Sequence, residues 1–151
     1  MKTDLVVAGY LIHRNKVLLI KHKKIGKWLP PGGHIEPNET PDEALKREIK
    51  EELNLDIEIL NTTRVAEEGN IKQQLAVPFY VNVHSVGSHD HCCLFYICKP
   101  KNPEQIALNQ AELDGYKWFT KEELKQVPVD VKNIALKAFE VYEWLTQNES
   151  R

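Results

Sequence analysis

Residues 32–55, GGHIEPNETPDEALKREIKEELNL, constrain this chain more than any other segment. A Gly-Gly turn leads into a stretch that brings together five acidic side chains: Glu36, Glu39, Glu48, Glu51 and Glu52. Clustered carboxylates repel one another, and a bound cation relieves that repulsion. Oxygen ligands at this density suit Mg²⁺ or Mn²⁺ better than zinc. The segment therefore predicts a site for a hard divalent cation.

The same segment predicts a helix from Pro41 to Leu53. Thr40 is a good N-cap, Pro41 suits the first helical position, and Glu43 completes a capping box with Thr40. Asn54 tolerates the left-handed conformation in which many helices end. The start and the end of the helix are thus both marked in the sequence.

Helical spacing sorts the acidic side chains. At about 100° per residue, Leu45 and Ile49 form an apolar stripe that can pack on a core. Glu48, Glu51 and Glu52 border that stripe at spacings of three and four residues, so all three can reach one metal ion. A solvated helix face, with lysines paired to the acids, is the alternative interpretation. The Gly-Gly turn, the capping box and the fixed spacing favour the metal site.

The spacing resembles the Nudix signature. In that signature, Gly, five residues and Glu are followed by seven residues, Arg-Glu, an aliphatic residue, any residue, Glu-Glu, any residue, Gly and an aliphatic residue. Here the pattern runs from Gly33 through Glu39 and Arg47 to Leu55, and Asn54 replaces the last Gly. Asn is the next-best residue for that backbone role. The resemblance is therefore nearly complete over the signature.

The resemblance implies a hydrolase that cleaves a diphosphate linkage in a nucleoside diphosphate joined to another group, with Mg²⁺ or Mn²⁺ as cofactor. It implies metal ligands at Glu48, Glu51, Glu52 and the carbonyl of Gly32, and it implies that Arg47 orients a glutamate through a charge-assisted hydrogen bond. Such metals act as Lewis acids and lower the pKa of bound water, while a carboxylate accepts the proton of that water. Family members differ in whether this base lies on the helix or on a later loop.

An acidic loop supplies candidates for a loop base. Glu112 lies six residues before Trp118, an interval similar to that in some Nudix proteins, and Asp114 competes with it. An ordinary acidic turn before a strand is an equally good interpretation, because loop acids are common.

Candidate substrate contacts flank the signature. Trp28 can stack on a nucleotide base, a contact worth about 1–3 kcal/mol, or anchor the core, and Phe79 and Tyr80 carry the same alternatives. Asp130, close to the start of the last predicted helix, is a candidate base contact from its position alone. Basic side chains before the Gly-Gly turn can meet phosphates or remain solvated: Lys21, Lys23, Lys24 and Lys27.

Histidines and cysteines gather in residues 84–98, which raises the alternative of a zinc-dependent interaction domain: His84, His89, His91, Cys92, Cys93 and Cys98. The segment has no C-x-x-C pair. Strand alternation places His89, His91 and Cys93 on one face, and Cys92 and Cys98 on the other. We therefore expect ordinary strand residues in a reducing compartment, without a disulfide framework.

The remaining sequence predicts one domain, 1–151, with mixed strands and helices. Residues 5–14 and 16–23 predict a β-hairpin, and 23–33 a loop broken by Gly and Pro. Residues 56–68, 77–86, 91–98 and 116–119 predict extended segments, 121–126 a short helix opened by Thr120 and Glu123, and 131–145 a longer helix. The tail 146–151 is polar and predicted to fray. This order fits the α/β/α sandwich with a mixed sheet that the resemblance implies.

Composition limits the partners. The net charge of −2 provides no global field for nucleic acid, and no apolar run approaches transmembrane length. The first residues do not read as a signal peptide, so we expect a cytoplasmic protein with a small nucleotide as substrate; a homodimer is left open.

Three functions remain at this stage. The leading hypothesis is a Nudix pyrophosphohydrolase acting on a nucleoside triphosphate or a similar free nucleotide, because the chain is small. An ADP-sugar or dinucleoside polyphosphate hydrolase is the alternative within the enzyme class. A non-catalytic binding or regulatory module with the same fold is the third, and the complete set of motif acids argues against it.

Overall fold

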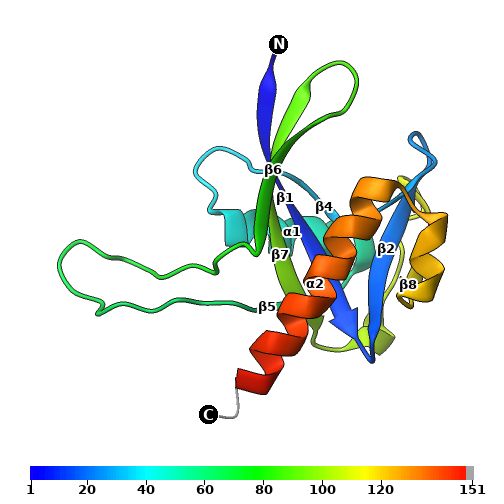
Figure 1. The fold of residues 1–151 in the computed structure, drawn as a ribbon. Coiled ribbons are helices and arrows are strands. Elements are labelled where there is room, and N and C mark those ends of the chain that lie inside the picture. The colour runs from blue at the N-terminus through cyan, green and yellow to red at the C-terminus, as the bar shows by residue number, and fades with distance from the viewer. Residues whose placement is uncertain (149–151) are drawn as a thin grey trace.

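A mixed β-sheet lies between two helices in the computed structural model, which describes residues 1–148 (Figure 1). The helices are α1 (Pro41–Leu53) and α2 (Val129–Asn148), with 3₁₀ turns η1 (Pro103–Gln105) and η2 (Glu122–Gln126). The strands are β1 (Thr3–His13), β2 (Lys16–His22), β3 (Trp28–Leu29), β4 (Gly32–His34), β5 (Ile57–Ile59), β6 (Tyr80–Ser85), β7 (Asp90–Pro100) and β8 (Leu113–Phe119).

The sheet is built around β1 and β7. Its order is β3-β2-β1-β7-β5, and β4, β6 and β8 pair with β1, β7 and β2 respectively. The β1–β7 pair is parallel and all other pairs are antiparallel. The predicted β1–β2 hairpin is confirmed: Arg14 and Asn15 have φ of 50° and 62°, the two positive values that a type I′ turn requires.

Two hydrophobic cores cover the two faces of the sheet. On one face, Leu45, Ile49 and Leu53 of α1 pack with Leu11 and Tyr96. On the other face, α2 packs against β1 and β7 through a cluster that includes Tyr10, Phe95, Phe119, Ala135 and Phe139. Both helices use their apolar stripes as expected. The predicted α/β/α sandwich is confirmed.

Several predicted boundaries differ from the structure. The predicted loop 23–33 contains β3 and β4, whose two or three residues are too short to show periodicity and are defined by pairing with β2 and β1. The short helix predicted at 121–126 is the 3₁₀ helix Glu122–Gln126. Only Ile57–Ile59 of 56–68 is a strand, and the chain beyond it projects from the sheet (Figure 1).

The last helix is longer than predicted. It begins at Val129 and continues to Asn148, so residues 146–148 are helical where fraying was predicted. The rest of that predicted tail, 149–151, lies outside the described residues. Between residues 1 and 148, neither helix has the length and apolarity needed to cross a lipid bilayer.

Candidate active site

The predicted start and end of α1 are confirmed. The Glu43 N–H donates to Thr40 Oγ1 at 3.1 Å, and the Thr40 N–H donates to Glu43 Oε1 at 3.0 Å. At the other end, Asn54 adopts φ 53° and ψ 38°, and its N–H donates to the Lys50 carbonyl at 2.9 Å. Asn54 thus performs the left-handed turn for which the signature uses Gly.

Gly32 and Gly33 lie within β4, where the sequence predicted a turn, and they allow this strand to approach α1 closely. A Cβ atom on Gly33 would overlap the carboxylate of Glu48, and one on Gly32 would overlap the carbonyl of Val7. The Gly32 N–H donates to Glu52 Oε1 at 3.0 Å. The two glycines therefore place backbone directly against the helix glutamates, which no larger residue permits.

Arg47 connects the acidic residues to one another. It holds Glu39 through both carboxylate oxygens, with Nε–Oε2 2.7 Å and Nη2–Oε1 3.0 Å, and it donates to Glu48 Oε1 at 3.0 Å. Nη1 also lies 3.5 Å from Glu51 Oε2, and Nη2 donates to the His34 carbonyl at 3.0 Å. The hydrogen bond with Arg47 lowers the pKa of Glu39. Arg47 thus makes the type of contact with Glu48 that the sequence predicted.

The three signature glutamates of α1 differ in their surroundings. Glu52 is 3% exposed, and burial raises its pKa to about 8 although the Gly32 N–H favours the ionised form. Burial also raises the pKa of Glu48, with Arg47 opposing the shift. Glu51 is exposed, with 58% of its side chain accessible. The site therefore combines buried, crowded acids with one acid at the solvent boundary.

The loop before β8 reaches the same site. The negative charge of Glu112 contributes to raising the pKa of both Glu48 and Glu52. Its carbonyl accepts the Lys23 N–H at 3.1 Å, which fixes the loop beside the end of β2. Asp114 lies within β8, and the charge that raises the pKa of the helix acids from this loop is that of Glu112.

His22 is a site residue that the sequence did not reveal. Its Nε2 lies 3.6 Å from Glu52 Oε2, and burial lowers its pKa while the charge of Glu112 opposes that shift. A register shift between Lys21 and His22 occurs where β2 pairs with β8. A bulge of this kind redirects side chains, and neither hydrophobic alternation nor the signature indicates it.

The predicted substrate contacts differ in burial. Trp28 is half-buried against Phe119, with ring centroids 5.2 Å apart, and therefore has the packing of a core anchor. Lys27 is exposed in the turn before β3. Asp130 is exposed in the first turn of α2, and its charge contributes to raising the pKa of Tyr10. Trp28 packs on the core that contains α2, and Asp130 belongs to α2, whereas α1 lies on the other face of the sheet.

The cysteines do not form a metal site with the histidines. Cys93 and Cys98 are buried on opposite faces of β7, as alternation predicted, and burial raises the pKa of the Cys93 thiol to about 12. Within residues 1–148, the group of potential ligands that forms around His89 and His91 contains no cysteine. The Cys-based zinc alternative is therefore not supported by the structure.

The acidic site has the donor chemistry of a hard-cation site. Its glutamates offer carboxylate oxygens, with the His22 imidazole as the neighbouring nitrogen donor, and two of the carboxyl groups have a pKa raised by burial and mutual repulsion. A divalent cation would offset both effects, and oxygen ligands of this kind suit Mg²⁺ or Mn²⁺. The residues present therefore fit the cation that the signature implies.

Comparison with known proteins places the chain in a family. Residues 2–145 match the NUDIX domain, so the chain belongs to the Nudix hydrolase family. Nucleoside triphosphatase NudI of Enterobacter sp. (strain 638) is 30% identical over 108 residues, which cover 70% of each chain. The Homo sapiens 8-oxo-dGDP phosphatase NUDT18 is 43% identical over 67 residues, which cover 42% of this chain and 21% of that protein.

Solved structures agree with this family. A hydrolase of the NUDIX family from Clostridium perfringens superimposes with a TM-score of 0.78 and 29% identity, covering 94% of this chain and 99% of the other. A MutT NUDIX hydrolase from Burkholderia pseudomallei has a TM-score of 0.69 at 21% identity, covering 91% and 98%, which shows the shared fold. The matches span 21% of the human and mouse relatives and 51% of the Proteus vulgaris 8-oxo-dGTP diphosphatase.

Proposed function

We propose that this protein is a Mg²⁺- or Mn²⁺-dependent pyrophosphohydrolase that cleaves a diphosphate linkage in a free nucleotide, with a nucleoside triphosphate as the first candidate substrate. The observation that carries the proposal is the group formed by Glu48, Glu51, Glu52 and Glu112 beside Gly32 and Gly33. Buried carboxylates whose ionised forms are disfavoured are suited to binding a cation.

Each residue has a proposed role. Glu48, Glu51, Glu52 and the Gly32 carbonyl would hold the cation. That cation would neutralise diphosphate charge and acidify bound water. Arg47 positions Glu48 through its hydrogen bond, and Glu39 holds Arg47 in turn.

The base remains a choice between two kinds of acid. A helix glutamate is close to the proposed cation ligands, while Glu112 approaches from the loop and acts electrostatically on Glu48 and Glu52. Either carboxylate can accept a proton from water within hydrogen-bond reach. His22, beside Glu52, would restrict the position of that carboxylate.

A substrate panel tests the proposal. Purified protein with Mg²⁺ or Mn²⁺ would be offered nucleoside triphosphates, 8-oxo-dGDP and 8-oxo-dGTP, 5′-triphosphorylated RNA, an ADP-sugar and a dinucleoside polyphosphate. The relatives' names motivate the oxidised nucleotides and the RNA. We expect the highest kcat/KM with a free nucleotide and no turnover when EDTA is present.

Other outcomes discriminate among the alternatives. Preference for the ADP-sugar or the dinucleoside polyphosphate would replace the proposed substrate class while retaining the reaction. Binding of metal and nucleotide without any turnover would instead support a non-catalytic module. Turnover that persists in EDTA would contradict the metal assignment.

A further inference from the structure

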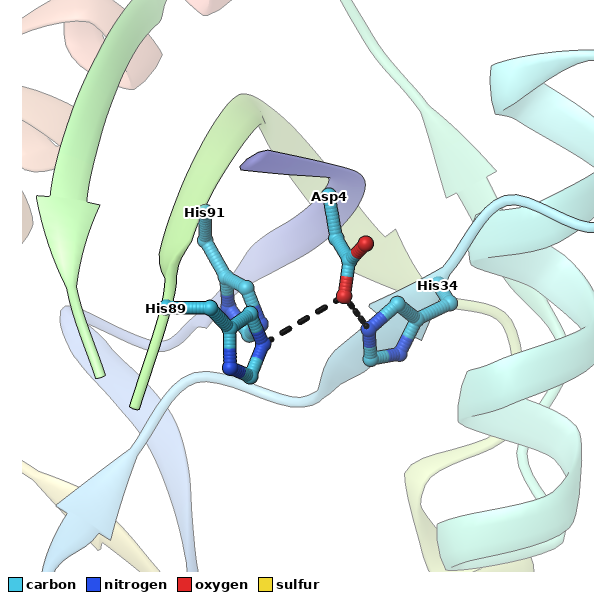
Figure 2. A group of neighbouring side chains, drawn as sticks. All are labelled: Asp4, His34, His89 and His91. Atoms are coloured by element: carbon cyan, nitrogen blue, oxygen red, sulfur yellow. Dashed lines mark hydrogen bonds and ion pairs between the residues drawn. The ribbon is translucent and has the colours of Figure 1, made fainter. Parts of the chain in front are cut away.

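A second group of potential metal ligands lies beside β4. Asp4 of β1, His34 of β4, His89 just before β7 and His91 of β7 each offer one ligand atom, and all four atoms lie within 4.8 Å of one another. Figure 2 shows the four side chains converging from these separate segments. Because Gly33 faces Glu48, strand alternation directs His34 to the opposite side of β4. The histidines are thus separate from the glutamate site.

The strand register holds these residues in place. Asp4 is the direct partner of His91 in the parallel β1–β7 pair, and Val6 is the partner of His34 in the β1–β4 pair. The Asp90 N–H donates to the Lys2 carbonyl at 2.9 Å, and the Val86 N–H donates to the His89 carbonyl at 2.9 Å, closing the turn before β7. A site built on paired strands is better fixed than one built on loops alone.

The shortest distances in the cluster match a tetrahedral metal site. His34 Nε2 and His89 Nε2 lie 3.2 and 3.3 Å from Asp4 Oδ2. For Zn–N and Zn–O bonds of about 2.0–2.1 Å, neighbouring ligands of a tetrahedron are about 3.3–3.4 Å apart. His91 lies against both partners, with ring centroids 5.3 Å from His34 and 5.0 Å from His89. A small movement of the rings would complete the coordination.

Neighbouring residues contact Asp4 and His89 through the atoms that do not face the other potential ligands. Lys2 Nζ pairs with Asp4 Oδ1 at 3.4 Å, while Asp4 Oδ2 faces the imidazoles. Ser88 Oγ lies 2.9 Å from His89 Nδ1, so a hydrogen bond orients that ring through the nitrogen farther from Asp4. His89 Nε2 is buried and makes no hydrogen bond of good geometry within residues 1–148. This is the arrangement in which a second partner orients a ligating histidine.

We propose that Asp4, His34, His89 and His91 form a second metal site, which binds one Zn²⁺ ion in tetrahedral coordination. Imidazole nitrogens favour zinc and related transition metals, whereas Mg²⁺ prefers oxygen ligands. Three histidines with one carboxylate supply four ligands from three strands and a turn. The two metal sites would therefore select different ions.

Zinc at this site would restrict the movement of β4. The His34 carbonyl accepts the Arg47 Nη2–H at 3.0 Å, and Gly33 lies against the Glu48 carboxylate. Fixing the His34 side chain to β1 and β7 would therefore limit movement of a strand that borders the glutamate site. The proposed zinc is a structural ion, and its binding does not depend on the proposed hydrolysis.

Zinc titration tests the proposal directly. Protein without a histidine tag would be freed of metal, supplied with excess Mg²⁺ to occupy the glutamate site, and titrated with Zn²⁺ against a chromogenic chelator. We expect one Zn²⁺ per chain and an increase of several degrees in Tm, because an ion that binds only the folded state stabilises it. His89→Ala and Asp4→Asn should each weaken binding by more than about tenfold.

His84→Ala is the matched control. The His84 ring lies 5.6 Å from His91, but its Nδ1 pairs with Asn82 and it is outside the four-ligand group. Its zinc affinity should equal that of the wild type. X-ray absorption of the zinc-loaded wild type covers the case in which a variant fails to fold: it should show nitrogen and oxygen ligands only. A Zn–S distance near 2.3 Å, equal affinity in all variants, or no zinc binding in excess Mg²⁺ would overturn the proposal.

Discussion

The two sides of β4 carry two different kinds of polar cluster. On the Gly33 side, buried carboxylates crowd around one arginine, and burial raises the pKa of Glu48 and Glu52. On the His34 side, three imidazoles surround a single carboxylate at a less buried edge of the sheet. The first cluster gathers several carboxylates, whereas the second contains the single carboxylate of Asp4. The three-residue strand β4 thus separates a cluster of oxygen ligands from a cluster rich in nitrogen ligands.

The two clusters also differ in how the chain assembles them. The glutamates occur within one helix, where spacings of three and four residues bring side chains together. The histidine cluster requires β1, β4 and β7 to be paired in the correct register. Because the glutamates are held by one helix and do not join separate strands, substitutions on the Gly33 side should change turnover much more than they change the fold.

The largest effect is expected at Glu52. Glu52→Gln should reduce kcat by about 10²–10⁴-fold, because it removes a buried carboxylate that is a proposed metal ligand and candidate base. The fold should remain, since Gln is nearly isosteric and its side-chain oxygen can accept the Gly32 N–H. Steady-state kinetics with Mg²⁺ and circular dichroism measure the two properties. Near-normal turnover would remove Glu52 from the site.

A smaller loss is expected at Arg47. Arg47→Lys keeps the charge but removes the fork that holds Glu39 and Glu48 together. Loss of such an orienting partner should lower kcat/KM by about 10–100-fold.

The matched control is Lys50→Met, which removes another basic residue of α1, paired with the exposed Asp56 at 3.3 Å. Exposed pairs contribute little, so kcat/KM should change by less than about twofold. Equal losses in the two variants would mean that turnover is sensitive to any change of a basic residue on α1, and not to the particular contacts of Arg47.

Glu112 should affect cation binding more than the chemical step. Because its charge acts on Glu48 and Glu52, Glu112→Gln should raise the Mg²⁺ concentration for half-maximal turnover by about tenfold, equivalent to about 1.4 kcal/mol. Asp114→Asn should leave that concentration unchanged. A fall in kcat as large as that for Glu52→Gln would instead identify Glu112 as the base.

The sequence predicted α1 almost completely because all its determinants are local. Thr40 and Glu43 form the capping box, Asn54 ends the helix, and the acids follow helical spacing. The sandwich was implied by the resemblance to the Nudix signature, and the order of elements fitted it. In contrast, β3 and β4 contain too few residues to show periodicity, and they exist because β2 and β1 pair with them.

Long-range geometry explains what the sequence could not provide. His22 reaches Glu52 where the register shifts beside β8, and Asp4 meets His91 through parallel pairing of strands far apart in the chain. The histidine-rich segment was visible in the sequence, but the sequence suggested its neighbouring cysteines as the further metal ligands, whereas the structure places Asp4 and His34 beside His89 and His91. Asp4 and His34, which complete the cluster, carry no signal in their own segments.

The smallest expected effect concerns stability as a function of pH. Burial raises the pKa of Glu52 to about 8, compared with about 4.5 in the unfolded chain. The folded state therefore binds the proton more tightly, so the stabilisation is fully present below pH 4.5 and is lost as pH rises through 8. In EDTA, the Tm of the wild type should fall by on the order of 10 °C across this interval, relative to Glu52→Gln.

Thermal melts from pH 5 to 9, for the wild type and Glu52→Gln with and without Mg²⁺, measure this difference. Mg²⁺ should reduce it in the wild type, because the cation favours the ionised carboxylates on the Gly33 side. The histidine cluster is present in both proteins, so its contribution cancels in the comparison. Parallel Tm curves for the two metal-free proteins would show that the pKa of Glu52 is not raised by burial, and the raised pKa on the Gly33 side of β4 would then belong to Glu48 alone.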